Sequence, residues 1–174
     1  SIGVPMYPSL LKVTLLAVTM AMGTSAYAAG DAEAGQAKAA TCVACHGVDG
    51  NSAVPTFPKL AGLGHKYLLK QMQDIRDGRR PVALMAGQVD NMTDQDLSDI
   101  AAFYDSQSRT GGMADPDKVA LGRKVYLAGI AERQVPACSG CHSPTGNGNG
   151  PAGYPALGGQ HADYCLLYTS DAAD

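Results

Sequence analysis

A five-residue pattern, Cys-x-x-Cys-His, occurs twice in this sequence and constrains its fold more than any other feature. The pattern comprises Cys42, Cys45 and His46 in the first copy and Cys138, Cys141 and His142 in the second. In each copy two thiols are spaced to bond to two vinyl groups on one edge of a porphyrin, and the adjoining histidine can then reach the iron. The pattern therefore predicts two covalently attached haem c groups, each held by two cysteines and bound through one histidine.

Three other uses of a Cys-x-x-Cys pair compete with haem attachment. A redox-active pair belongs in a strand-helix-strand context, which neither copy has. A zinc ribbon places its two pairs roughly 15–20 residues apart, whereas 92 residues separate Cys45 from Cys138. Two disulfides suit an oxidising compartment, but they leave the adjoining histidines unexplained. Haem attachment accounts for the cysteines and the histidines together.

The segments around the two copies also match, which indicates an internal duplication. Pro58 lies 12 residues after His46 and begins the run Pro-Lys-Leu-Ala-Gly. Pro155 lies 13 residues after His142 and begins Pro-Ala-Leu-Gly-Gly. The period is too long for a solenoid unit. We therefore expect two sister domains.

The N-terminus has the features of a signal peptide. Lys12 precedes a mostly apolar run over residues 13–22, and Ala26-Tyr27-Ala28 matches an A-x-A cleavage site. The run is shorter than the roughly 20 residues that a spanning helix needs. We expect export with residues 1–28 as the leader.

Helical periodicity predicts an all-α fold for both domains, with helices over residues 31–41, 64–77, 94–106 and 115–127. The apolar faces of the second and third helices supply the candidate core: Leu68, Leu69, Met72, Ile75, Leu97, Ile100, Ala101 and Tyr104. No convincing strand pattern is found. Domains this small bury little apolar surface, which suits a fold assembled around a prosthetic group.

Charge and composition exclude several classes of protein. The net charge is −3, so no basic surface favours nucleic acid. Hydrophobic residues make up 45% and charged residues 17% of the chain. These values are typical neither of a disordered chain nor of an all-apolar membrane protein.

The second axial ligand decides whether a haem iron is open or closed. An iron bound only by histidine binds small molecules, whereas a histidine/methionine pair gives a closed, high-potential centre for electron transfer. Met85 lies in a predicted loop that can reach the far side of the first haem, and Met92 is the alternative. Met72 lies on an apolar helical face, where packing is its expected role.

The second haem has no equivalent candidate, because the sequence contains no methionine after Cys138. His161 is the nearest substitute. Its counterpart in the first domain is His65, which suggests that both histidines serve the junction between loop and helix. The sequence therefore does not assign a sixth ligand to the second haem.

Taken together, these motifs resemble the diheme cytochrome c4 family. The resemblance spans about residues 29–164 and rests on Cys-Val-Ala-Cys-His-Gly-Val-Asp-Gly-Asn-Ser at 42–52, Phe-Pro-Lys-Leu-Ala-Gly at 57–62, Tyr-Leu-Leu-Lys-Gln at 67–71, Thr-Asp-Gln-Asp-Leu at 93–97 and Pro-Ala-Leu-Gly-Gly-Gln-His at 155–161. It implies two tandem class I cytochrome c folds, with His46 and Met85 as the first axial pair and His142 as the proximal ligand of the second haem. It also implies that the carbonyl groups of Pro58 and Pro155 orient the two imidazoles.

The resemblance further implies a periplasmic electron carrier that links a quinol-oxidising complex to a terminal oxidase. Peripheral association of the carrier with the membrane is compatible with this role. An open second haem would instead suit a diheme peroxidase or a haem-based gas sensor. The absence of a predicted acid/base residue near that iron argues against the peroxidase.

The C-terminal end departs from the family pattern. Family members continue with another helix, a methionine-bearing loop and a final helix, and residues 165–174 resemble a translated sequencing adapter. The expected organisation is a leader over 1–28, a first domain over 29–110, an incomplete second domain over 111–164 and a non-native tail over 165–174.

Overall fold

The computed structural model describes residues 30–170, so the predicted leader lies outside the described residues. The α-helices are α1 (Ala32–Lys38), α2 (Val43–His46), α3 (His65–Arg76), α4 (Asp94–Asp105), α5 (Pro116–Ala128), α6 (Ser139–His142) and α7 (Ala162–Ser170). Three short 3-10 helices are η1 (Ala39–Thr41), η2 (Ala83–Met85) and η3 (Ala131–Arg133). The part of the chain that is described contains two isolated β-bridges but no strand. The all-α prediction is confirmed, and no described helix is long and apolar enough to cross a membrane.

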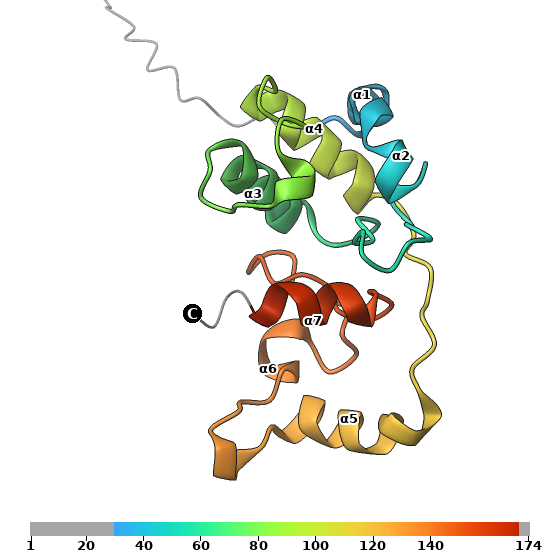
Figure 1. The fold of residues 1–174 in the computed structure, drawn as a ribbon, viewed down its shortest axis with the longest axis vertical. Coiled ribbons are helices and arrows are strands. Elements are labelled where there is room, and N and C mark those ends of the chain that lie inside the picture. Colours follow the sequence, from blue (N-terminus) through green and yellow to red (C-terminus); the bar gives the residue numbers. More distant parts are fainter. Residues whose placement is uncertain (1–29, 171–174) are drawn as a thin grey trace, which may run out of the picture.

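The chain forms two groups of helices connected by an extended segment (Figure 1). The N-terminal unit, residues 30–110, contains α1 to α4, and the C-terminal unit, residues 111–170, contains α5 to α7. The four longer predicted helices are all present within a few residues of their expected ends, since strong local signals define them. Thr93 caps α4 through a capping box with Asp96, and Asp115 caps α5 ahead of a proline in its first turn.

Helix α1 crosses α4 at backbone contact distance. A Cβ atom built on Gly35 would lie 2.0 Å from the carbonyl oxygen of Asp99, and one built on Gly30 would lie 2.1 Å from that of Ser98. Only glycine permits so close an approach. The crossing therefore depends on the absence of two side chains.

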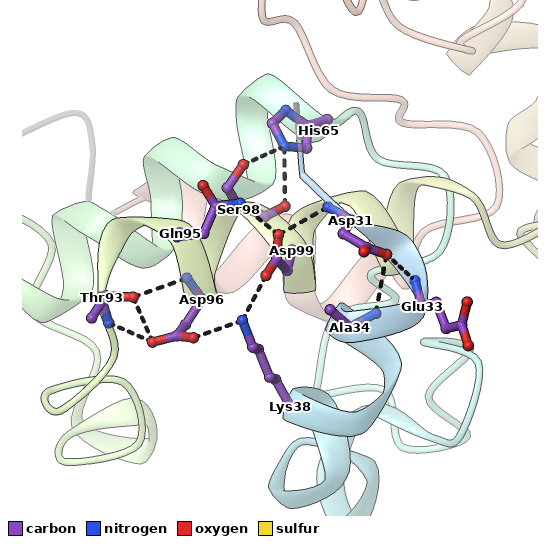
Figure 2. A network of polar contacts seen from close by, with 10 residues as sticks. All are labelled: Asp31, Glu33, Ala34, Lys38, His65, Thr93, Gln95, Asp96, Ser98 and Asp99. Carbon is purple, nitrogen blue, oxygen red and sulfur yellow. Dashed lines mark hydrogen bonds and ion pairs between the residues drawn. The ribbon is translucent and has the colours of Figure 1, made fainter. Parts of the chain in front are cut away.

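A polar network reinforces this crossing (Figure 2). Lys38 Nζ lies 2.6 Å from Asp99 Oδ2 and 2.7 Å from Asp96 Oδ1, and the Asp31 N–H donates to Asp99 Oδ1 at 2.9 Å. Hydrogen bonds from Lys38 lower the pKa of both Asp96 and Asp99. Asp99 is only 3% exposed, so Lys38 supplies the charge that such a buried carboxylate needs.

The apolar core lies between α3 and α4. Leu68, Leu97, Ile100, Ala101 and Tyr104 are each less than 5% exposed, as predicted. The other three predicted core residues, Leu69, Met72 and Ile75, are half-buried. Met72 packs against this core, and Met72 and Ile75 also line a cavity.

The C-terminal unit has far less interior than the N-terminal unit. Helix α5 has no buried residue, and Leu121 on it is 65% exposed. Ala156 is the one buried apolar residue of the described part of this unit. Helix α7 begins at Ala162 and continues through Ser170, across the predicted boundary between residues 164 and 165. Nothing in the described unit covers α5 as α4 covers α1.

The extended segment between the units is attached to the N-terminal unit where it begins. Lys59 is 6% exposed, and its Nζ donates to the carbonyl oxygen of Thr110 at 3.0 Å and to the Thr110 hydroxyl at 2.9 Å. Asn51 Oδ1 accepts from the Thr110 N–H at 2.8 Å. The start of the predicted linker is thus held in a fixed position.

Candidate functional site

The first Cys-x-x-Cys-His motif forms a single short helix. Cys42 is the N-cap of α2, and His46 is its last residue. Residues three and four apart on a helix share a face, so Cys42, Cys45 and His46 lie together. Gly47 then ends the helix with φ at 81°, a conformation that side chains disfavour, and the chain turns into the loop that follows.

The imidazole of His46 is fixed by one hydrogen bond. Its Nδ1 lies 2.9 Å from the carbonyl oxygen of Pro58. A carbonyl can only accept, so Nδ1 carries the proton and Nε2 keeps its lone pair for a metal. The side chain is 7% exposed, and this burial lowers the pKa of His46. The ring is therefore held neutral, as a ligand must be.

A cavity of about 270 Å³ adjoins this histidine. Its walls come from α2, α3, α4 and the loop around η2, and they include Cys42, Cys45, His46, Met72 and Met85. The remaining lining is largely apolar, as is usual for cofactor sites. The motif thus opens onto a hollow with methionine sulfur available on other walls.

The candidate methionines occupy different positions. Met85 is half-buried at the end of η2 and lines the cavity. Met72 lines it too, from α3, whereas Met92 packs against the apolar core and is not among the lining residues. The competitor to Met85 at the cavity is therefore Met72 and not Met92. Met113 is 99% exposed and takes no part.

The residues present fit a haem c. Two thiols and a neutral imidazole meet at one edge of an apolar hollow, which is the donor set that this group requires. Tyr104 also belongs to the lining; its hydroxyl is buried and makes no hydrogen bond among the described residues. Such an unpaired hydroxyl suits a cofactor that carries polar groups on its rim.

The second motif repeats the same local geometry. His142 Nδ1 lies 2.8 Å from the carbonyl oxygen of Pro155. Tyr154 meets the His142 ring edge-on at a centroid distance of 5.7 Å, as Phe57 meets His46 at 6.4 Å.

The backbone around the motifs is duplicated as well. Ser143 follows His142 with φ at 67°, close to the 81° of Gly47. The Leu157 N–H donates to the Gly146 carbonyl at 2.8 Å, and the Leu60 N–H donates to the Gly50 carbonyl at 2.7 Å. The duplication predicted from sequence is present at the level of single hydrogen bonds.

The second site differs in its surroundings. His142 is half-buried, and its unit has no described helix that corresponds to α4, although α7 follows His161 where α3 begins at His65. His161 Nε2 lies 2.9 Å from the carbonyl oxygen of Ser52, in the other unit. His65 likewise bonds the Ser98 carbonyl at 3.1 Å. Both histidines hold loop-to-helix junctions, which is the role that the sequence favours for them.

Two residues of the first cavity were missed by sequence reasoning. Tyr164, on α7 of the C-terminal unit, lines this cavity, and its hydroxyl accepts from Arg80 Nη2 at 3.1 Å. Tyr67 lines the same wall, and burial raises its pKa. Arg80 and Tyr164 lie 84 residues apart, and no sequence pattern pairs them.

Comparisons with known proteins agree with this geometry. The family model for cytochrome c matches residues 32–108. The chain is 56% identical over 135 residues to cytochrome c4 of Pseudomonas aeruginosa, which covers 78% of this chain and 67% of that protein. The crystal structure of reduced recombinant cytochrome c4 from Pseudomonas stutzeri superimposes with a TM-score of 0.80 at 53% identity, covering 82% of this chain and 80% of that one. A thiosulfate dehydrogenase electron acceptor of Stutzerimonas stutzeri is 35% identical, covering 72% of this chain and 60% of that protein.

Proposed function

The chain belongs to the cytochrome c4 family, and from this premise we propose that it carries single electrons between respiratory-chain partners in the periplasm. Family membership establishes an electron-transfer protein with covalently bound haem c, two haems being what a diheme family carries, and not an enzyme. The observation that carries the proposal is the repeated geometry of motif, imidazole and proline carbonyl in both units.

We assign the site residues by unit. Cys42 and Cys45 attach the first haem, and His46 with Met85 binds its iron. In the second unit, Cys138 and Cys141 attach the haem, and His142 is the proximal ligand. The matching domains are residues 29–110 and 111–164.

The bound haem supplies a reversible one-electron couple, and the chain tunes and shields it. His46 keeps its proton on Nδ1, which donates to the Pro58 carbonyl oxygen, so no proton needs to move with the electron. The apolar wall excludes water from the ligand face, and Met85 in place of a labile ligand favours the reduced state. Both features suit outer-sphere transfer rather than bond-making chemistry.

The proposed partners are a quinol-oxidising complex as donor and a terminal oxidase as acceptor. One relative suggests a second donor, because a thiosulfate dehydrogenase electron acceptor is 35% identical to this chain over 136 aligned residues. The net charge of −3 gives no ground for a nucleic-acid partner.

The proposal is tested by rapid mixing of the holoprotein with each partner class. We expect reduction by a quinol-oxidising complex and oxidation by a terminal oxidase, each faster than with a mismatched redox protein. Reduction by thiosulfate dehydrogenase alone would redirect the role to thiosulfate oxidation. Turnover of hydrogen peroxide without either exchange would contradict the carrier role.

A further inference from the structure

Gln160, in the C-terminal unit, hydrogen-bonds to the peptide group that orients the first histidine. The carbonyl oxygen of Pro58 accepts from His46 Nδ1 at 2.9 Å. The N–H of that same peptide group belongs to Lys59, and it donates to Gln160 Oε1 at 2.9 Å. Gln160 Nε2 in turn donates to the carbonyl oxygen of Lys59 at 2.8 Å. One relay of hydrogen bonds therefore connects Gln160 to His46 through a single amide.

The orientation of the Gln160 amide is fixed by its neighbours. Its oxygen accepts from two N–H groups, those of Lys59 and His161, the latter at 3.0 Å, while its nitrogen faces a carbonyl. Reversing the amide would place donors against donors. Lys59 is 6% exposed, so water does not readily replace Gln160 as its partner.

The relay has an electronic consequence. Hydrogen bonds in a chain polarise one another, so an acceptor at the Lys59 N–H makes the Pro58 carbonyl oxygen more negative. A more negative carbonyl holds the Nδ1 proton of His46 more strongly and makes the ring a more basic ligand. A more basic imidazole favours the ferric state over the ferrous state. Gln160 thus acts on an iron ligand that it does not touch.

The second site lacks this relay. The Pro155 carbonyl accepts from His142 Nδ1 at 2.8 Å, but the N–H of that peptide group, on Ala156, has no acceptor anywhere in residues 30–170. The two ligand loops, which connect His46 to Pro58 and His142 to Pro155, match in other respects. The difference between them is a contact that the C-terminal unit makes to the N-terminal unit and does not receive in return.

We propose that Gln160 is a positioning residue for His46 and lowers the reduction potential of the first haem selectively, so that docking of the two units sets part of the potential difference between the haems. The proposal rests on the function proposed above, since it requires His46 as an iron ligand. The interface between the units would thus contribute to the reduction potential of the first haem.

The test measures both midpoint potentials of the holoprotein by spectroelectrochemistry. A variant with Cys138 and Cys141 replaced by serine keeps the first haem alone and assigns its potential, and the remaining potential belongs to the second haem. Gln160→Met removes the acceptor at nearly constant volume, and we expect the first potential to rise with the second unchanged. Gln160→Glu offers a stronger acceptor, and we expect the first potential to fall. In Gln160→Met, NMR should also show faster solvent exchange of the His46 Nδ1 proton.

His161→Phe is the matched control, because it removes a neighbouring bond between the units, to Ser52, and leaves the relay intact. We expect it to leave both potentials in place. Equal shifts in His161→Phe and Gln160→Met would mean general loosening of the interface and would overturn the proposal, as would shifts of the same sign in Gln160→Met and Gln160→Glu. These readings use the isolated protein, so a failure to exchange electrons with respiratory partners would count against the proposed function alone.

Discussion

The two units carry nearly the same ligand loop in very different surroundings. The distances from the imidazole Nδ1 to the proline carbonyl are 2.9 Å and 2.8 Å, yet His46 is 7% exposed whereas His142 is half-buried. The loop is a local structure that a short stretch of sequence specifies. The walls around the first site include α3, α4 and the loop around η2, and the described C-terminal unit has no counterpart of α4. A histidine can thus be oriented without being enclosed.

The largest effect should follow from removing the covalent anchors. Replacing Cys42 and Cys45 by serine should lower the haem count by one and unfold much of the N-terminal unit, because cofactor binding there contributes folding free energy. The same change at Cys138 and Cys141 should also cost one haem but little helix, since α5 buries no residue. Mass spectrometry and far-ultraviolet circular dichroism measure both. Equal helix loss in the two variants would contradict the comparison.

The next largest effect concerns the axial methionine. Met85→Ala should abolish the near-infrared charge-transfer band of the ferric protein and lower the first potential, because the thioether favours ferrous iron. Met92→Ala should do neither, since Met92 is not among the residues that line the cavity.

Met72→Ala is the sharper control for that assignment, because Met72 shares the cavity wall with Met85. We expect it to keep the band and to lose stability by about 2 kcal/mol or more, as a core truncation does. Loss of the band in Met72→Ala alone would transfer the ligand role to α3.

Two helical glycines offer a direct comparison of the units. Gly35→Ala would place a Cβ 2.0 Å from a backbone oxygen of α4, so α1 must move away. We expect a loss of about 3 kcal/mol, at the upper end of overpacking costs. A Cβ atom built on Gly122 of α5 would have nothing within 4 Å, so Gly122→Ala should stabilise α5 by up to about 1 kcal/mol. Denaturant unfolding, with m held constant, measures both changes.

The smallest effect is a difference in acid sensitivity. The pKa values of Asp96 and Asp99 are lowered in the folded state, chiefly by Lys38, so their stabilising contribution is full above the unfolded value near 4 and is lost as the pH falls below it. Lys38→Met removes the cation, raises these pKa values, and should move the acid unfolding of the N-terminal unit to higher pH. Circular dichroism in an acid titration measures the midpoint.

Lys118→Met is the control in the other unit. Lys118 pairs with Asp115 at 3.1 Å, but its side chain is 82% exposed, and pairs of this kind contribute little. If the acid midpoint shifts equally in both lysine variants, the buried Lys38–Asp99 ion pair contributes no more stability than the exposed Lys118–Asp115 pair, which would contradict this prediction.

Several features of the site were predictable from the sequence because they are local. The spacing within each motif places two thiols and an imidazole on one helical face, and capping residues such as Thr93 fix where helices begin. The proline carbonyl that receives each imidazole follows its histidine by 12 or 13 residues, at matching places in the two copies. The family resemblance rests on the same short segments.

Only the tertiary structure decided which neighbours each helix face and each loop contacts. Periodicity placed Met72 on an apolar face but did not show that this face also borders a cavity. Only the packing of the chain brings Met72, and not Met92, to the cavity wall. Tyr164 at the first cavity and Gln160 on the Lys59 peptide come from the other unit, and their partners lie 84 and 101 residues away in sequence. A residue pattern records the period of its own helix or loop, whereas a contact between distant segments depends on how the whole chain packs.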